Sequence, residues 1–235
     1  MAETFPLISC ICMTNNRTAL LKRAIACYKS QNYPNKQLVV CHPAMDHQTK
    51  AVVDSLSEEL KGMVLIVAQK GTLSAASILQ LAISKSKGEF ICLWHDSDWH
   101  HPSRLWFQYN SIQGTRYNAS MLTRFILYDD SYGKAYFSSH YPLYGSLLCE
   151  KSIISSNPLE SFTNAKDTTL FKYLNSNQLL FRIDDCAFLY AYVYHEKETR
   201  KFWDNNHIFK HSELLKNELT KTIHDLLDFS NYGNL

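Results

Sequence analysis

The chain has no run of 18 apolar residues, so no segment is predicted to cross a membrane as a helix. It has no cluster of Lys and Arg, and a net charge of only +2 does not favour a nucleic-acid surface. The start, MAETFPLISC, lacks a basic leader and a long apolar stretch, so no signal peptide is predicted. We therefore expect a cytoplasmic protein, with peripheral attachment to a membrane left open.

The seven cysteines form no Cys-x-x-Cys pair, and their number is odd. Most of them stand inside apolar patterns, which is typical of reduced, buried thiols. No internal repeat, low-complexity segment or linker interrupts the chain. The sequence predicts one domain over residues 1–235.

The first half of the chain alternates apolar runs of strand length with apolar residues at helical spacing. Strands are expected over 7–13, 37–41, 63–67 and 90–94, and helices over about 20–28, 49–60, 74–85 and 102–113. Strand–helix–strand units of this length predict a parallel sheet with right-handed crossovers. The predicted fold class is α/β, with a mostly parallel, Rossmann-like sheet in the N-terminal half.

The second half is predicted to contain more strands than helices. Strands are expected over 121–128, 134–138, 147–149, 179–183 and 187–195. A helix is expected over 168–174, with Asp167 as a candidate N-cap. A C-terminal helix over 212–229 would place five apolar residues on one face, Leu215, Leu219, Ile223, Leu226 and Leu227. We expect that face to pack on the sheet, with homodimer formation as the alternative use.

The stretch from Gly88 to Leu105 joins a predicted buried strand to the acidic loop His95-Asp96-Ser97-Asp98. Ligands of open α/β sheets bind beyond the carboxyl ends of the strands, so Asp96 and Asp98 would stand where a cation is useful. An Asp-Ser-Asp triplet is also common in turns, where its side chains cap backbone amides. The triplet alone does not decide between a turn and a cation site.

Four motifs stand in order along the chain. The first, PxxSxxxxTxNR, is matched by Pro6, Ser9, Thr14, Asn16 and Arg17, and an AIxxxxxQxYP helix follows from Ala24 to Pro34. The other three motifs are the stretch from Leu81 to Leu105, an aspartate at the start of a helix (Asp167), and a tyrosine-rich strand that ends at His195. Together they resemble glycosyltransferase family 2, whose GT-A fold enzymes use sugars linked to nucleotide diphosphates.

The resemblance implies a single GT-A-like domain with a nucleotide-sugar-binding half (1–114), an acceptor half (115–199) and a C-terminal helical tail (200–235). It implies a nucleotide-sugar donor, with a UDP-sugar favoured, and a hydroxyl acceptor on a glycan, a lipid or a protein. The implied cofactor is a divalent cation, Mn²⁺ or Mg²⁺.

The resemblance also assigns roles to named residues. Donor binding would involve Thr14, Asn16, Arg17, Asp96 and Asp98, and the metal would be held by Asp96, Asp98 and His195. Asp167 would be the catalytic base of an inverting transfer, removing the proton of the acceptor hydroxyl.

Three departures from the family pattern bear on these roles. The acidic pair that follows the second strand in the family is replaced here by His42-Pro43, and Lys166 precedes Asp167. The acidic loop begins with a histidine, so its metal-binding pattern could start at His95 or at Asp96. The alternatives are a degenerate relative that binds nucleotide sugar without turnover and a metal-dependent phosphohydrolase.

Overall fold

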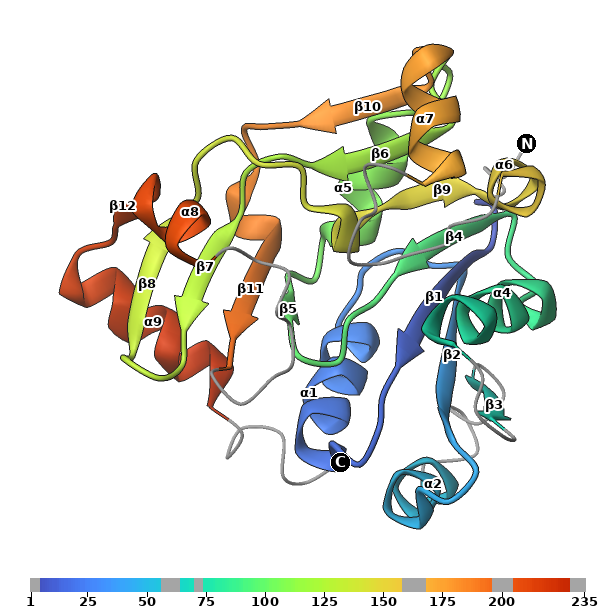
Figure 1. The fold of residues 1–235 in the computed structure, drawn as a ribbon, viewed down its shortest axis with the longest axis horizontal. Coiled ribbons are helices and arrows are strands. Elements are labelled where there is room, and N and C mark those ends of the chain that lie inside the picture. The colour runs from blue at the N-terminus through green and yellow to red at the C-terminus, as the bar shows by residue number, and fades with distance from the viewer. Residues whose placement is uncertain (1–4, 56–63, 70–73, 158–167, 196–204, 229–235) are drawn as a thin grey trace.

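Two β-sheets stand side by side in the protein (Figure 1). The computed structural model describes residues 5–55, 64–69, 74–157, 168–195 and 205–228; for 64–69 and 205–207 it describes the backbone. The larger sheet has seven strands and the smaller sheet has five.

The larger sheet has the order β10-β6-β9-β4-β1-β2-β3. Its strands are β1 (Ile8–Met13), β2 (Lys36–Pro43), β3 (Val64–Gln69), β4 (Phe90–Leu93), β6 (Ala119–Leu122), β9 (Leu148–Glu150) and β10 (Leu180–Ile183). β1 pairs in parallel with β2 and β4, and β2 pairs in parallel with β3. The parallel sheet predicted for the N-terminal half is confirmed, and β9 runs antiparallel between β4 and β6.

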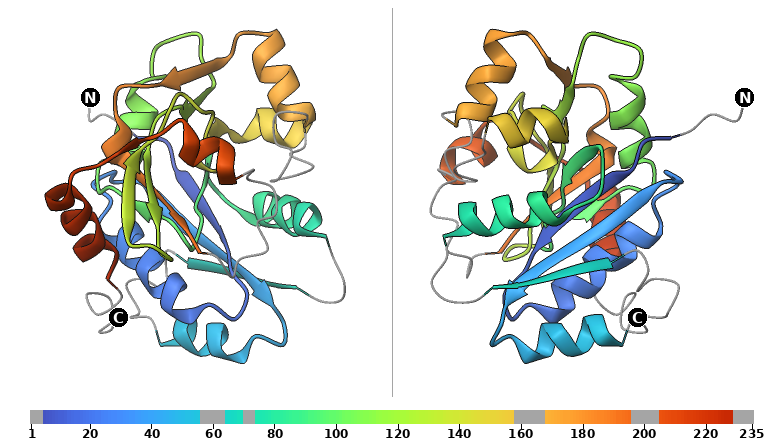
Figure 2. Two further views of the ribbon diagram at one scale, coloured as in Figure 1. Left: turned by 60° about the vertical axis from the view of Figure 1, so that its left-hand side comes forward. Right: turned by 90° about the vertical axis from the view of Figure 1, so that its right-hand side faces the viewer.

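Helices cover both faces of the larger sheet (Figure 2). One face carries α1 (Thr18–Lys29), α2 (His47–Asp54) and α5 (Arg104–Asn110), and the other carries α4 (Ala75–Lys85), α6 (Lys151–Ser156) and α7 (Thr169–Ser176). Side chains alternate along a strand, so Cys10 and Cys12 pack on the α1 face while Ile11 packs on the α4 face. Burial on both faces explains why these strands are continuous apolar runs.

The smaller sheet has the order β12-β8-β7-β11-β5. Its strands are β5 (Trp99–His100), β7 (Ile126–Asp129), β8 (Lys134–Phe137), β11 (Tyr190–Tyr194) and β12 (Glu213–Leu214). Two helices pack on this sheet, α8 (Asn205–Lys210) through Phe209 and α9 (Asn217–Leu227) through Leu227. The short 3₁₀ helices η1 (Tyr144–Ser146) and η3 (Ala187–Leu189) lead into β9 and β11.

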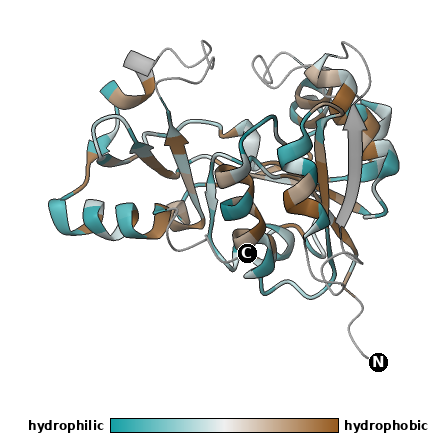
Figure 3. Ribbon diagram, turned by 90° about the horizontal axis from the view of Figure 1, so that it is seen from below, coloured by the Kyte–Doolittle hydropathy of each residue, from teal (hydrophilic) through white to brown (hydrophobic). Residues whose placement is uncertain are grey.

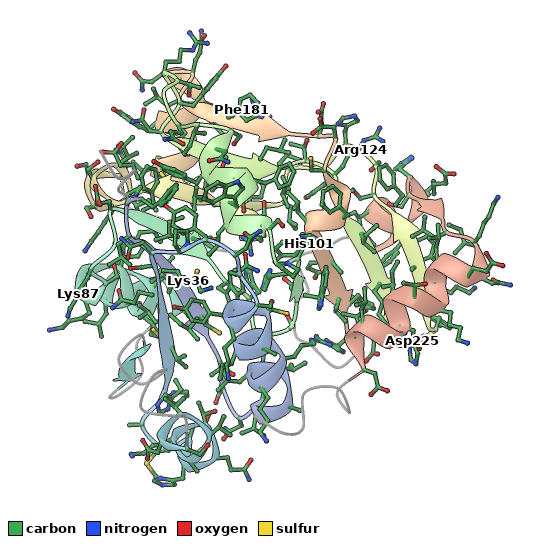
Figure 4. The ribbon with its side chains drawn as sticks, turned by 180° about the vertical axis from the view of Figure 1, so that it is seen from behind. Lys36, Lys87, His101, Arg124, Phe181 and Asp225 are labelled. Carbon is green, nitrogen blue, oxygen red and sulfur yellow. The ribbon has the colours of Figure 1, made fainter. Side chains whose placement is uncertain are left out.

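The two-residue strand β5 joins the acidic loop to the smaller sheet. Trp99 and His100 pair antiparallel with Ala191 and Tyr190 of β11. His101, which follows β5, lies between the two sheets in the view from behind (Figure 4), and its amide donates to the carbonyl of Leu189 at 3.1 Å. The loop after β4 is therefore held by both sheets.

Several elements in the second half of the chain differ from the prediction. The single strand predicted over 121–128 is two strands, β6 and β7, which belong to different sheets. The chain turns between them, because Thr123 bonds to the carbonyl of Ile183 and the amide of Phe125 donates to Ser138 Oγ. The described N-cap of α7 is Thr168 rather than Asp167, which lies outside the described residues.

The predicted C-terminal helix begins later than expected, after the short strand β12. Figure 3 shows hydrophilic and hydrophobic segments alternating along α9, in line with the predicted amphipathic pattern. Only part of the predicted apolar face is buried, because Leu219 remains 52% exposed and Leu226 42% exposed.

All seven cysteines are free thiols, as predicted, and six of them are buried. Within the described ranges, no helix combines the length and the apolar character needed to cross a membrane.

Candidate active site

The carboxyl ends of β1 and β4 bring the β1–α1 turn next to the acidic loop. Arg17 precedes α1 and forms an ion pair with Asp96, with Nη2 lying 3.1 Å from Oδ1. The side chain of Arg17 is 35% exposed, whereas that of Asp96 is 2% exposed. Two predicted donor-binding residues, far apart in sequence, thus meet where ligands of open α/β sheets bind.

Asp46 fixes the β1–α1 turn to α2. Its Oδ2 accepts the backbone N–H of Asn16 at 2.7 Å, and its Oδ1 accepts the N–H of Thr49 at 2.9 Å as the cap of α2. Burial alone would raise the pKa of Asp46, but the hydrogen bonds from Thr49 and Asn16 and the nearby His42 outweigh it and lower the pKa. The carboxylate is therefore charged at neutral pH and holds the predicted donor-binding residue Asn16 in place.

Two buried polar atoms lie at the ends of β1 and β2. Thr14 donates its backbone N–H to the carbonyl of Cys41 at 2.9 Å, but its hydroxyl Oγ1 has no hydrogen-bond partner among the described residues. His42 has its Nδ1 at 2.9 Å from the carbonyl of Pro43, and within the same part of the chain its Nε2 has no partner. Buried polar atoms are rarely left unsatisfied, so a bound group at this edge would be stabilised.

Asp98, one of the three predicted metal ligands, bonds to the smaller sheet. Tyr190 donates its phenol O–H to Oδ2 at 2.5 Å, and the N–H of Val193 donates to Oδ1 at 3.2 Å. Asp98 is only 1% exposed. Both of its carboxylate oxygens therefore accept hydrogen bonds from β11.

His195, another of the three predicted metal ligands, follows β11. Its Nδ1 lies 2.8 Å from Oδ2 of Asp130, and its buried Nε2 has no hydrogen-bond partner within the described ranges. Asp130, which lies between β7 and β8, was not predicted as a site residue. A carboxylate on one ring nitrogen fixes the orientation of a histidine and leaves the other nitrogen for a ligand.

The three predicted metal ligands therefore have different partners: Arg17 for Asp96, Tyr190 and Val193 for Asp98, and Asp130 for His195. Over the residues that the structure describes, no three His, Cys, Asp or Glu side chains are grouped so that they could hold a metal ion.

Arg23, a buried residue of α1, supports the acidic loop. Its Nη2 donates to the carbonyl of Ser97 at 2.6 Å, and its Nη1 donates to the carbonyl of Leu227 at 3.0 Å. One side chain therefore joins the loop to the end of α9. Sequence reasoning missed this residue, because an arginine inside an amphipathic helix is normally read as a surface residue.

A second buried arginine, Arg104 of α5, holds the strand that leads into the loop. It donates to the carbonyl of Leu93 at 3.0 Å and lies 2.7 Å from Nδ1 of His100, whose Nε2 is 3.2 Å from the carbonyl of His95. Burial, reinforced by the charge of Arg104, holds the pKa of His100 well below its usual value of 6.5. His100 is therefore a neutral structural residue at physiological pH.

His95 packs on the short helix η1, in the second half of the chain. A Cβ atom added to Gly145 of η1 would lie 2.7 Å from His95 Nε2, so the ring packs directly on this glycine. η1 in turn contacts α7, where the rings of Tyr144 and Phe171 have centroids 4.6 Å apart. The loop thus adjoins the helix that follows the predicted base Asp167.

An open, mostly parallel sheet, an acidic loop after β4 and a second small sheet beside that loop define the GT-A class of glycosyltransferase fold. The family described as Glycosyl transferase family 2 matches residues 9–196, and the chain belongs to this family. No curated protein matches the sequence significantly.

Solved structures of glycosyltransferases share the fold. S. aureus TarS 1–349, in complex with UDP-GlcNAc, aligns with a TM-score of 0.65 and 15% identity over 82% of this chain and 60% of that one. The mannosyltransferase PcManGT from Pyrobaculum calidifontis, in complex with GDP-Man and Mn²⁺, aligns with a TM-score of 0.63 and 15% identity. The alignment covers 85% of this chain and 59% of that one. Glucosyl-3-phosphoglycerate synthase from Mycobacterium tuberculosis, in complex with Mn²⁺, UDP and glucosyl-3-phosphoglycerate, aligns with a TM-score of 0.57 and 10% identity. The alignment covers 76% of this chain and 70% of that one. The chain thus spans about 60% of the length of the first two.

Proposed function

We propose that the protein moves a sugar from a nucleotide-diphosphate donor to a hydroxyl acceptor on a glycan, a lipid or a protein. The observation that supports this function is the ion pair between Arg17 and Asp96 at the carboxyl ends of β1 and β4, in a chain of family 2. A UDP-sugar is the favoured donor, and the TarS structure with UDP-GlcNAc gives an example of such a donor on this fold.

Residues 1–114 would form the donor half, 115–199 the acceptor half and 200–235 a C-terminal tail. Arg17 and Asp96, which form an ion pair, would bind the donor together with Thr14 and Asn16 of the neighbouring turn. A guanidinium group binds phosphate oxygens through two parallel hydrogen bonds, and Arg17 supplies that group. Asp98, which accepts a hydrogen bond from Tyr190 of the smaller sheet, would then hold the acidic loop in position.

Asp167 is proposed as the catalytic base. In a single inverting displacement, the acceptor oxygen would bond to the anomeric carbon as the bond from that carbon to the diphosphate oxygen breaks. The acceptor proton would pass to the carboxylate of Asp167, and no covalent enzyme intermediate forms. The adjacent Lys166 would favour the charged form of this base.

A divalent cation is predicted from the sequence and is present in the mannosyltransferase and glucosyl-3-phosphoglycerate synthase structures. The described residues fit such an ion poorly. Both oxygens of Asp98 already accept hydrogen bonds, and the carboxylate of Asp96 already faces the cation Arg17. No step of the proposed reaction is therefore assigned to a metal.

The test combines nucleotide binding with product analysis. Thermal unfolding is measured with UDP, GDP and their sugar derivatives, since a ligand of the folded state raises the unfolding temperature. Stabilising donors are then incubated with and without a mixture of glycan and lipid acceptors. Sugar transfer that depends on an acceptor supports the proposal, and the absence of any stabilising nucleotide would overturn it.

The two alternatives predict other outcomes. A degenerate relative binds a nucleotide sugar but releases no product, and a phosphohydrolase releases phosphate at the same rate with or without acceptor. Asp167→Asn should lower transfer by about 100-fold or more and leave nucleotide affinity unchanged. Asp184→Asn, at an exposed aspartate of the same half, is the control and should behave like the unaltered protein.

A further inference from the structure

The geometry of the acidic loop points to a donor site that neutralises the diphosphate with Arg17 and requires no divalent cation. This inference rests on the proposed function for the class of donor. It goes beyond that function in naming the group that carries the positive charge.

Asp98 joins the acidic loop to the smaller sheet. Its carboxylate accepts the phenol of Tyr190 and the amide of Val193, and it is 1% exposed. If Asp98 coordinated a cation, the buried phenol of Tyr190 and the amide of Val193 would lose their acceptor. An unsatisfied buried donor costs free energy of folding. Asp98 therefore has a structural role, which is to join the acidic loop to the smaller sheet.

Asp96 already has a positive partner. Its Oδ1 lies 3.1 Å from Nη2 of Arg17, so a divalent cation on this carboxylate would bring two positive centres close together in a largely buried site. Ser97 separates the two aspartates, and its carbonyl is bonded to Arg23. A second cationic side chain, that of Arg23, thus faces the backbone of the same loop.

An anion fits the same place better than a cation does. Arg17 is the N-cap residue of the 12-residue helix α1, and its own side chain makes no capping hydrogen bond there. The positive end of the helix dipole therefore adds to the guanidinium charge. The buried hydroxyl of Thr14, at the start of the same turn, has no hydrogen-bond partner among the described residues.

Asp96 then acts as the group that orients Arg17, rather than as a metal ligand. A carboxylate on one edge of a guanidinium fixes its plane, and 35% exposure of the Arg17 side chain leaves it within reach of a bound ligand. As the glycosidic bond breaks, negative charge accumulates on the leaving diphosphate. Arg17 and the α1 terminus would stabilise that charge.

The test is calorimetric titration of the metal-stripped full chain with UDP and GDP, once in EDTA and once in excess Mn²⁺. The dissociation constant should agree within twofold between the two buffers. Arg17→Ala should weaken binding at least tenfold in both buffers, and Arg17→Lys should give an intermediate value. Lys29→Ala, at the exposed end of the same helix, is the control and should leave binding unchanged.

Binding that requires Mn²⁺, and that Asp98→Asn abolishes, would overturn the inference while upholding the proposed function. Absence of binding by any nucleoside diphosphate in either buffer would overturn both. The comparison of buffers uses the unaltered protein, so it decides the role of the cation even where Arg17→Ala impairs folding.

Discussion

The phenol of Tyr190 lies 2.5 Å from Oδ2 of Asp98 and fastens the acidic loop to β11, across 92 positions of sequence. The backbone amide of Val193 donates to Oδ1, the other oxygen of the same carboxylate. The loop that follows β4 is therefore fixed from the smaller sheet. Asp96, two residues earlier, remains at the edge with Arg17.

Asp98→Asn should destabilise the fold by about 1–3 kcal/mol, because the new amide cannot accept both hydrogen bonds and places a donor against a donor. Tyr190→Phe should cost about 1–2 kcal/mol for the lost phenol. Urea unfolding of both single variants and the double variant measures the coupling, which should exceed about 0.5 kcal/mol. Wild-type stability in Asp98→Asn would contradict this structural role.

Arg23→Ala should loosen α9 as well as the acidic loop. Its guanidinium bonds the carbonyls of Ser97 and Leu227, and loss of two charge-assisted hydrogen bonds should cost about 2–4 kcal/mol. Hydrogen exchange should speed up in 217–227 and in 95–98 together. Faster exchange in only one of these segments, or equal changes in Lys29→Ala, would argue against Arg23 as their link.

Stability should fall as the pH drops below about 6.5, the usual pKa of histidine. Burial and Arg104 keep His100 neutral in the folded protein, so the unfolded chain binds the extra proton in this range. The slope from one such group is at most about 1.4 kcal/mol per pH unit. His101 adds to it with the same sign, whereas the lowered pKa of Asp46 acts only at more acidic pH.

Urea unfolding between pH 5 and 7.5 checks this dependence. His100→Asn should reduce the slope, and the same change at the exposed His140 should not. A slope that is identical in the unaltered protein and in His100→Asn would show that other groups cause it.

Gly145→Ala should displace His95, because the new Cβ would lie 2.7 Å from the ring nitrogen. A histidine ring can rotate, so we expect a stability loss below about 1.5 kcal/mol but a clear fall in transfer rate. Comparison of the unfolding temperature with turnover separates the two effects. Unchanged turnover would mean that the position of His95 does not matter to the reaction.

The strands around the site were predictable because β1, β2 and β4 are buried on both faces and form continuous apolar runs. β5 was not predictable: two residues carry no periodicity, and the strand exists only through its pairing with Ala191 and Tyr190. α6 and α8 are six residues each, too short for a helical pattern to stand out.

The meeting of Arg17 and Asp96 was predictable from the motifs, whereas the directions of the side chains in the acidic loop were not. The motifs placed Asn16, Arg17 and Asp96 together, and Arg17 and Asp96 do form an ion pair. Two aspartates one residue apart gave no sign that one faces Arg17 while the other faces Tyr190. That difference comes from β5 and β11, which pair across a long stretch of chain.

Hydrogen exchange of the full chain with and without a saturating UDP-sugar tests the donor edge most directly. We expect slower exchange in two separate segments at once, the turn at 14–18 and the loop at 95–98, and the same slowing in EDTA. Protection that leaves both segments unchanged, or that falls on another part of the molecule, would contradict the account.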